Sequence, residues 1–100
     1  MTDKKKEPNA KINLSISKDV AVGTYSNLII SNFSKEEFML DFALLQPHIK
    51  KADITSRVIL SPRNAKKLAS ILAKNIEEYE KNIGPITDGP ATPGFNISFN

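Results

Sequence analysis

Residues 53–72 read DITSRVILSPRNAKKLASIL, and within this stretch the spacing of apolar residues changes from that of a strand to that of a helix. Ser61 is a favourable N-cap, and Pro62 takes the first helical position, where its missing N–H costs nothing. A strand over residues 53–60, followed at once by a helix, is therefore predicted. Three apolar residues are expected on one side of that strand: Ile54, Val58 and Leu60.

The predicted helix ends at Gly84, because a glycine followed by Pro85 is a C-terminal stop signal. Its apolar residues form one stripe about 100° wide, typical of a helix that packs on another layer. We expect this stripe to cover one face of a sheet. It contains Ala65, Leu68, Ala69, Leu72, Ile76, Tyr79 and Ile83.

Three further strands are predicted upstream because residues alternate there between the two faces of a strand: residues 11–17, residues 20–33, and a strand that starts at Phe38 and stops at Pro47. Polar residues 34–37 form the turn between the last two. Short connections favour an antiparallel meander. The fold class is therefore predicted as α+β, a four-stranded antiparallel meander followed by one long amphipathic helix.

The register of these strands is predicted by keeping the inward apolar residues together, since a slip of one residue reverses every side chain. This condition pairs Leu40 with Val58 and Leu28 with Phe42. The first pairing also places Asp41 opposite Arg57 on the outer face of the sheet, where we expect a structural ion pair.

The chain ends differ from this domain in composition. Residues 1–10 form a charged leader expected to be flexible, residues 11–84 one domain, and residues 85–100 a linker rich in Pro and Gly with a short β-like end. Two interpretations of residues 95–99 stay open, an extra strand on a sheet edge or a disordered end.

Composition narrows the class of protein. The 100 residues are 40% hydrophobic, as in one globular domain, and the net charge is +3, with Lys4, Lys5 and Lys6 in the leader. Without cysteine there is no disulfide, thiolate nucleophile or cysteine metal site. No signal peptide or membrane-spanning run is recognisable, so a cytoplasmic location is expected.

Several blocks, in this order, carry a resemblance to a known family: Gly23-Thr-Tyr-Ser-Asn27, Glu37-Phe-Met-Leu-Asp-Phe42, Gln46-Pro47 and Ser56-Arg-Val-Ile-Leu-Ser-Pro62 with the helix to Glu80. Over about residues 12–83 the chain resembles a bacterial and archaeal family of small proteins known as domain of unknown function number 3467. The resemblance implies no reaction, cofactor or site. Four strands and then a long helix are also similar to the first part of the export chaperone SecB, an analogy of fold alone.

Residues suited to catalysis are few. His48 is the single histidine and lies in a turn beside Pro47, without a second histidine for a metal pair or a base for a nucleophile. Asp41 is the acid expected in the interior of a strand, and pairing with Arg57 explains it. We therefore expect neither an enzyme nor a bound cofactor or metal.

The charges of the helix are segregated against its macrodipole, with Arg63, Lys66 and Lys67 near its start and Glu77, Glu78 and Glu80 near its end. Three interpretations stay open. The basic turn binds an anion or nucleic acid, two helices meet antiparallel in a two-fold dimer, or the clusters form a solvated face. Nucleic acid is the less favoured partner, since no aromatic platform accompanies the basic residues.

The outer face of the predicted sheet gives the leading hypothesis of function. One helix covers one face of the sheet, which leaves the other face exposed to solvent in a monomer. We therefore expect a homo-oligomer, a dimer or larger, that uses this face for protein interaction or chaperone-like peptide binding. The candidate residues are Tyr25, Ile29, Met39, Ala43, Leu45 and Ile59.

Overall fold

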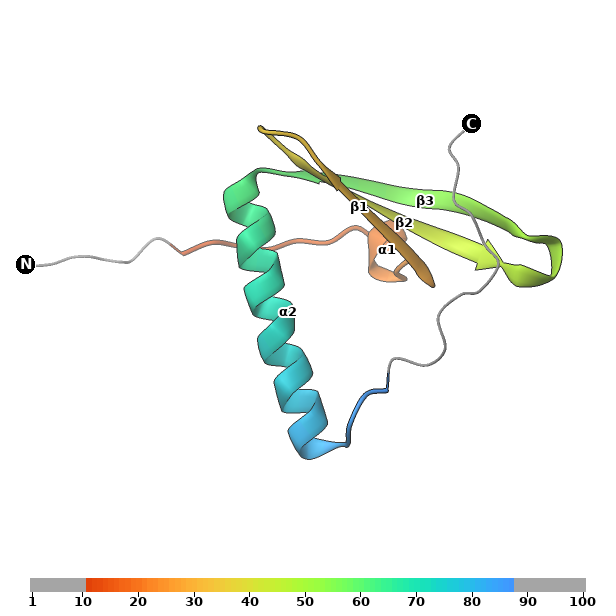
Figure 1. Ribbon diagram of the computed structural model, residues 1–100. Coiled ribbons are helices and arrows are strands. Elements are labelled where there is room, and N and C mark those ends of the chain that lie inside the picture. Colours follow the sequence, from red (N-terminus) through yellow and green to blue (C-terminus); the bar gives the residue numbers. More distant parts are fainter. Residues whose placement is uncertain (1–10, 88–100) are drawn as a thin grey trace, which may run out of the picture.

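The computed structural model describes residues 11–87 and has an α+β fold, with an antiparallel three-stranded sheet and a long helix after it (Figure 1). The leader, residues 1–10, and the β-like end, residues 95–99, lie outside the described residues. The elements are, in order, α1 (Lys18–Ala21), β1 (Leu28–Phe33), β2 (Phe38–Gln46), the 3-10 turn η1 (Pro47–Ile49), β3 (Lys51–Leu60) and α2 (Pro62–Asn82).

The N-terminal part of the described chain differs from the prediction of four strands. Residues 11–17 have no regular secondary structure, and the predicted long strand over residues 20–33 begins only at Leu28. Between them Ser17 caps α1, since its hydroxyl accepts a hydrogen bond from the Val20 amide at 3.4 Å. Alternation makes a segment suitable for a strand, but a strand also needs a backbone partner, and among residues 11–87 the segment 11–17 has none.

The β1–β2 register is one residue away from the predicted one, because Leu28 pairs with Ala43 and Ile29 pairs with Phe42. Asn27 holds this register. Its amide oxygen accepts from the Leu45 N–H at 2.7 Å, and its amide nitrogen donates to the Leu45 carbonyl at 3.0 Å. Two specific hydrogen bonds thus prevail over the apolar pattern of β1, and Ile29 lies on the opposite face from the predicted one.

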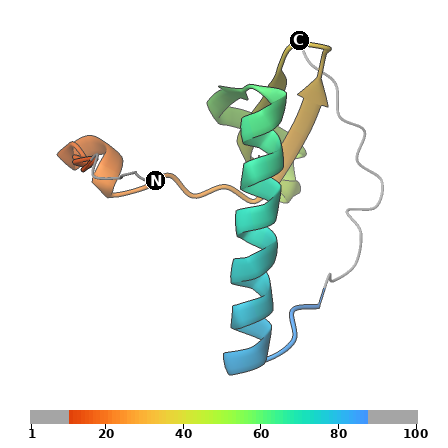
Figure 2. The same ribbon diagram turned by 90° about the vertical axis from the view of Figure 1, so that its left-hand side faces the viewer.

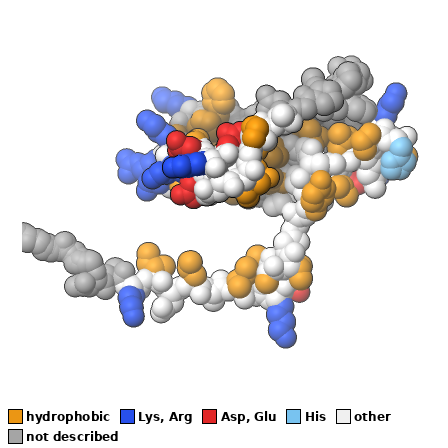
Figure 3. All heavy atoms as spheres, turned by 90° about the horizontal axis from the view of Figure 1, so that it is seen from below, with side chains coloured by type: hydrophobic (Ala, Val, Ile, Leu, Met, Phe, Trp, Pro, Cys, Tyr) orange, Lys and Arg blue, Asp and Glu red, His pale blue; other side chains and the backbone are white. Residues whose placement is uncertain are grey.

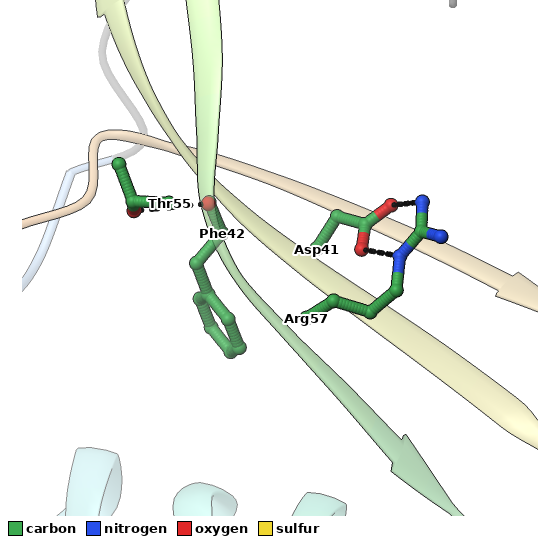
Figure 4. Close-up of polar contacts among 4 residues, drawn as sticks. All are labelled: Asp41, Phe42, Thr55 and Arg57. Carbon is green, nitrogen blue, oxygen red and sulfur yellow. Dashed lines mark hydrogen bonds and ion pairs between the residues drawn. The ribbon is translucent and has the colours of Figure 1, made fainter.

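The β2–β3 register agrees with the prediction over most of its length: Leu40 pairs with Val58 and Asp41 with Arg57. The pairing shifts after Phe42, which lies opposite Ser56, whereas Ala43 lies opposite Ile54. Thr55 is therefore the extra residue of a bulge, and its hydroxyl donates to the Phe42 carbonyl at 3.2 Å (Figure 4). The bulge overturns the prediction that Ile54 shares a side with Val58.

These registers give the sheet two apolar faces, which we name the helix face and the outer face. The helix face carries Ile29, Phe33, Phe38, Leu40, Phe42, Leu44, Val58 and Leu60. The outer face carries Leu28, Ile30, Met39, Asp41, Ala43, Leu45, Ile54, Arg57 and Ile59.

Helix α2 has the ends that the sequence predicts. The Ser61 hydroxyl accepts from the Asn64 amide at 3.2 Å, and Pro62 occupies the first turn. At the other end the amides of Ile83 and Gly84 both donate to the Tyr79 carbonyl, at 2.8 and 3.3 Å. Gly84 has φ of +153°, a backbone angle that favours glycine.

The prediction that α2 covers the sheet is wrong for its second half. Figures 1 and 2 show α2 starting beside the end of β3 and running away from the strands. Ala65 and Leu68, near its start, are half-buried, whereas Ile76 and Tyr79 are each 46% exposed and Ile83 is 71% exposed. The helix therefore presents most of its apolar stripe to solvent.

Residues 11–24, which we name the arm, extend away from the sheet (Figures 2 and 3). The apolar side chains of the arm are exposed by 65% or more: Ile12, Leu14, Ile16, Val20 and Val22. Among the apolar side chains of residues 11–87, Ala43 is the one that is buried, and Asp41 is the buried charged residue. The single chain thus has almost no core over this range.

None of the helices within residues 11–87 has both the length and the hydropathy that a bilayer-spanning helix requires.

Candidate functional site

An apolar groove lies between the first half of α2 and the helix face of the sheet. Its volume is about 550 Å³. The sheet contributes Ser31 from β1 and Phe38 and Leu40 from β2. Helix α2 contributes Pro62, Ala65, Lys66, Leu68, Ala69 and Leu72. Ser31 and Lys66 are the polar members, so the groove suits an apolar side chain far better than a charged substrate.

The groove exists because small residues of α2 face the sheet. Ala65 and Ala69 lack the length to reach the strands, whereas the adjacent Leu68 is half-buried. Opposite them Phe38 stacks on Phe33, with ring centroids 5.5 Å apart and planes 26° apart. Phe38 of this pair lines the sheet side of the groove.

Apolar surface continues from the groove in two directions. Along α2 the stripe passes from Leu72, which is 49% exposed, to Ile76, Tyr79 and Ile83. Across the sheet, Phe33 is 76% exposed and Ile29 is 64% exposed. Groove, stripe and strand residues together form one apolar surface, of the kind that marks an interface.

The outer face, predicted to be the interaction surface, is less uniform. Met39 and Leu45 lie on it and are half-buried, and Ile59 is 55% exposed. Ala43 also lies on it but is fully buried, so it offers no contact area. The other two candidates lie elsewhere. Tyr25 precedes β1 and is 75% exposed, and Ile29 is on the helix face.

The outer face also carries the predicted ion pair, which is confirmed (Figure 4). Arg57 donates from Nε to Asp41 Oδ1 at 2.6 Å and from Nη2 to Asp41 Oδ2 at 2.9 Å. These hydrogen bonds, aided by the guanidinium charge, lower the pKa of Asp41 against the opposing effect of its burial. Because both carboxylate oxygens are occupied, Asp41 is held as a structural anion and not as a free general base.

The basic residues proposed to bind an anion lie in the first turns of α2. Lys66 borders the groove, and Arg63 and Lys67 are exposed. The backbone N–H of Asn64, at the start of α2, donates to the Ser61 hydroxyl and is therefore already used by the N-cap. The acidic residues Glu77 and Glu78 lie about three turns further along the helix.

His48 lies in η1 and is exposed, as predicted for a turn residue. Lys50, which follows, adopts the left-handed conformation with φ of 51° and joins the turn to β3. Within residues 11–87 there is no group of three His, Cys, Asp or Glu side chains placed to hold a metal ion.

Sequence reasoning missed the groove, because Phe38, Leu40 and Leu68 have the pattern of ordinary core residues. One signal was available: the stripe of α2 combines two alanines at its start with large residues at its end. It also missed the structural role of Asn27, which closes the block Gly23-Thr-Tyr-Ser-Asn27 just before an apolar run.

The model of a family described as "Protein of unknown function (DUF3467)" matches residues 1–88. The match spans most of the chain, so the chain belongs to this family. No curated protein and no solved structure matched the chain.

Proposed function

We propose that this member of the family is a non-enzymatic interaction module that assembles with other copies of itself through the groove and the apolar surface around it. The observation that carries the proposal is the burial of a single apolar side chain, Ala43, within residues 11–87. A fold of this kind needs further apolar burial from a partner.

The energetics favour association. Ordering the backbone costs about 1–2 kcal/mol per residue. Burying a large apolar side chain returns about 1.5–3 kcal/mol. The chain leaves Phe33, Ile29 and Ile83 more than 60% exposed, so much of this stabilisation is unrealised in one copy. Contact with a second copy would bury these side chains without any change of fold.

The groove is favoured over the outer face as the principal contact. The outer face already contains the paired Asp41 and Arg57, and its central Ala43 is buried. The helix face has exposed aromatic and branched side chains beside an open groove. The residues that dominate the binding energy of protein interfaces cluster in well-packed, fully desolvated pockets.

The mass in solution tests the proposal. Light scattering at about 5 and about 100 µM should give at least twice the 11.1 kDa of one chain, and the melting temperature should rise with concentration. Lys74→Ala, on the polar side of α2, is the control and should behave like the wild type. A monomeric mass with a melting temperature independent of concentration would contradict the proposal.

A further inference from the structure

We propose that the occupant of the groove is α2 of a second copy, packed antiparallel against the first α2 about a two-fold axis at Leu72. The inference rests on the proposed function, self-association, and names the surface, the partner and the register of that association. It starts from an internal symmetry of the helix.

Five of the seven residues of the apolar stripe of α2 are symmetric in position about Leu72. Leu68 and Ile76 lie four residues before and after it, and Ala65 and Tyr79 lie seven residues before and after it. In an antiparallel pair centred on Leu72, Leu68 faces the partner's Ile76 and Ala65 faces the partner's Tyr79. The small residues at the start of one helix thus meet the large residues at the end of the other, which is the complementarity that close packing requires.

The course of α2 gives each half a separate role. The first half borders the groove beside Phe38 and Leu40, whereas the second half runs clear of its own sheet with its stripe exposed (Figures 1 and 2). Antiparallel pairing brings the second half of each helix to the groove of the other chain. The partner's Ile76 and Tyr79 then supply the large side chains that Ala65 and Ala69 do not. This arrangement is the helix-in-groove mode of recognition, made reciprocal by the two-fold axis.

The charges along α2 select the antiparallel orientation. Lys66 and Glu77 are eleven residues apart, and so are Lys67 and Glu78. Eleven residues make about three full turns, so each pair lies along one edge of the polar side of the helix, roughly 120–140° around the helix from Leu72. About a two-fold axis at Leu72 the basic half of each helix lies beside the acidic half of the other, with Lys66 level with the partner's Glu77 and Lys67 level with the partner's Glu78. A parallel pair would instead place like charges together.

The same arrangement accounts for charges that are unfavourable in one copy. Basic residues near the start of α2 and acidic residues near its end both oppose the helix macrodipole. In the antiparallel pair each cluster lies beside the opposite cluster, and the two macrodipoles run in opposite directions. The opposite charges and the reversed macrodipole of the partner helix thus offset the unfavourable interaction of each charge cluster with its own helix.

Charge reversal on the full chain tests the register. One variant, Lys66→Glu with Lys67→Glu, makes both helix edges acidic, and a second, Glu77→Lys with Glu78→Lys, makes both basic. Sedimentation should show self-association of each variant weakened by about tenfold or more, and an equimolar mixture should form a 1:1 complex. All four substitutions in one chain should restore self-association to within about threefold of the wild type.

The outcomes separate this inference from the function on which it rests. If the wild type is oligomeric and each double variant associates as tightly as the wild type, self-association stands and the antiparallel α2 pair is overturned. If the wild type is monomeric, both fail. Unfolding of a double variant alone, checked by circular dichroism, is resolved by the mixture, since recovery of helix on mixing supports the pair and failure to recover contradicts it.

An engineered cross-link tests the axis independently. The chain has no cysteine, so Leu72→Cys places one thiol per chain at the proposed axis, where the two β-carbons approach closely enough for a disulfide. Mild oxidation should give a covalent dimer in good yield. Lys74→Cys, two residues away on the opposite side of α2, is the control. Equal cross-linking of the two variants would overturn the proposed axis.

Discussion

Arg57 binds Asp41 with both arms of its guanidinium, Nε to Oδ1 at 2.6 Å and Nη2 to Oδ2 at 2.9 Å, across the β2–β3 ladder. Asp41 is 1% exposed, whereas the Arg57 side chain is 48% exposed. The carboxylate is thus desolvated, and Arg57 is the partner that compensates it among residues 11–87. The pair fixes the pairing of the two strands at their middle.

The ion pair predicts how stability depends on pH. The pKa of Asp41 is lowered in the fold by its hydrogen bonds to Arg57, so the unfolded chain takes up the proton first as the pH falls. The contribution is therefore complete above the unfolded pKa of about 3.9 and declines as the pH falls below it, until the folded carboxyl is protonated. Melting temperatures of the wild type and Asp41→Asn should differ by a constant amount from pH 7 to about pH 5 and converge towards pH 3. A difference that persists unchanged at pH 3 would contradict this assignment.

Replacing Arg57 with lysine should weaken the same pair without removing its charge. A lysine ammonium cannot occupy both carboxylate oxygens in the planar, bidentate manner of a guanidinium. The pKa of Asp41 should therefore rise towards its ordinary value, which an NMR titration of the Asp41 carboxyl measures. Lys51→Arg, at an exposed position of β3, is the control and should leave this pKa where it is.

Substitution of Asn27 should lower the free energy of unfolding more than substitution of any other residue outside the apolar surface. Each of its two hydrogen bonds to the Leu45 backbone is worth about 0.5–1.5 kcal/mol. Asn27→Asp keeps the acceptor but places a carboxylate oxygen against the Leu45 carbonyl, so chemical denaturation should show a larger loss for Asn27→Asp than for Asn27→Ala. Asn32→Ala, at an exposed position of β1, should have little effect. The reverse order of the two Asn27 variants would show that the register is held by other contacts.

The N-cap of α2 predicts a defined loss of stability. Ser61→Ala removes the acceptor of the Asn64 amide and should lower the free energy of unfolding by about 1 kcal/mol. Ser61→Asp keeps an acceptor and should retain most of that stability, which urea unfolding at one protein concentration measures. Equal losses for the two variants would indicate that the cap contributes little.

Substitutions of two isoleucines of α2 test whether the apolar stripe binds a partner or stays exposed to solvent. Ile76 lies on the stripe and is 46% exposed, and Ile71 lies off it and is 58% exposed. If the stripe is an interface, Ile76→Ser should raise the dissociation constant of the oligomer by about tenfold or more, whereas Ile71→Ser should change it little. Sedimentation velocity over a dilution series gives both constants. Similar values for the two variants would leave the stripe without a role in association.

The candidate site illustrates why sequence reasoning reached only part of it. Apolar residues at strand spacing show that Phe38 and Leu40 share a face, and helix spacing shows that Leu68 and Leu72 share another. Whether the two faces touch depends on the angle at which α2 leaves β3. Neither the strand spacing nor the helix spacing of the apolar residues determines that angle. The sequence therefore predicted a closed core where the structure has an open groove.

By itself, the sequence determined the features that depend on neighbours in the chain. Ser61 and Pro62 start α2, Gly84 follows its end, and the hairpin over residues 38–60 places Asp41 opposite Arg57. Such features follow from local hydrogen bonding and from alternation within one hairpin.

Only the tertiary structure decided the features that depend on contacts between distant residues. The two hydrogen bonds of Asn27 hold β1 one residue away from its predicted register. The bulge at Thr55 places Ile54 on the outer face. Within residues 11–87 the arm has no strand partner and α2 leaves its stripe exposed, because pairing and burial require a surface in the right place as well as a suitable pattern. Periodicity fixes which side chains share a face, and the three-dimensional path of the backbone fixes what that face meets.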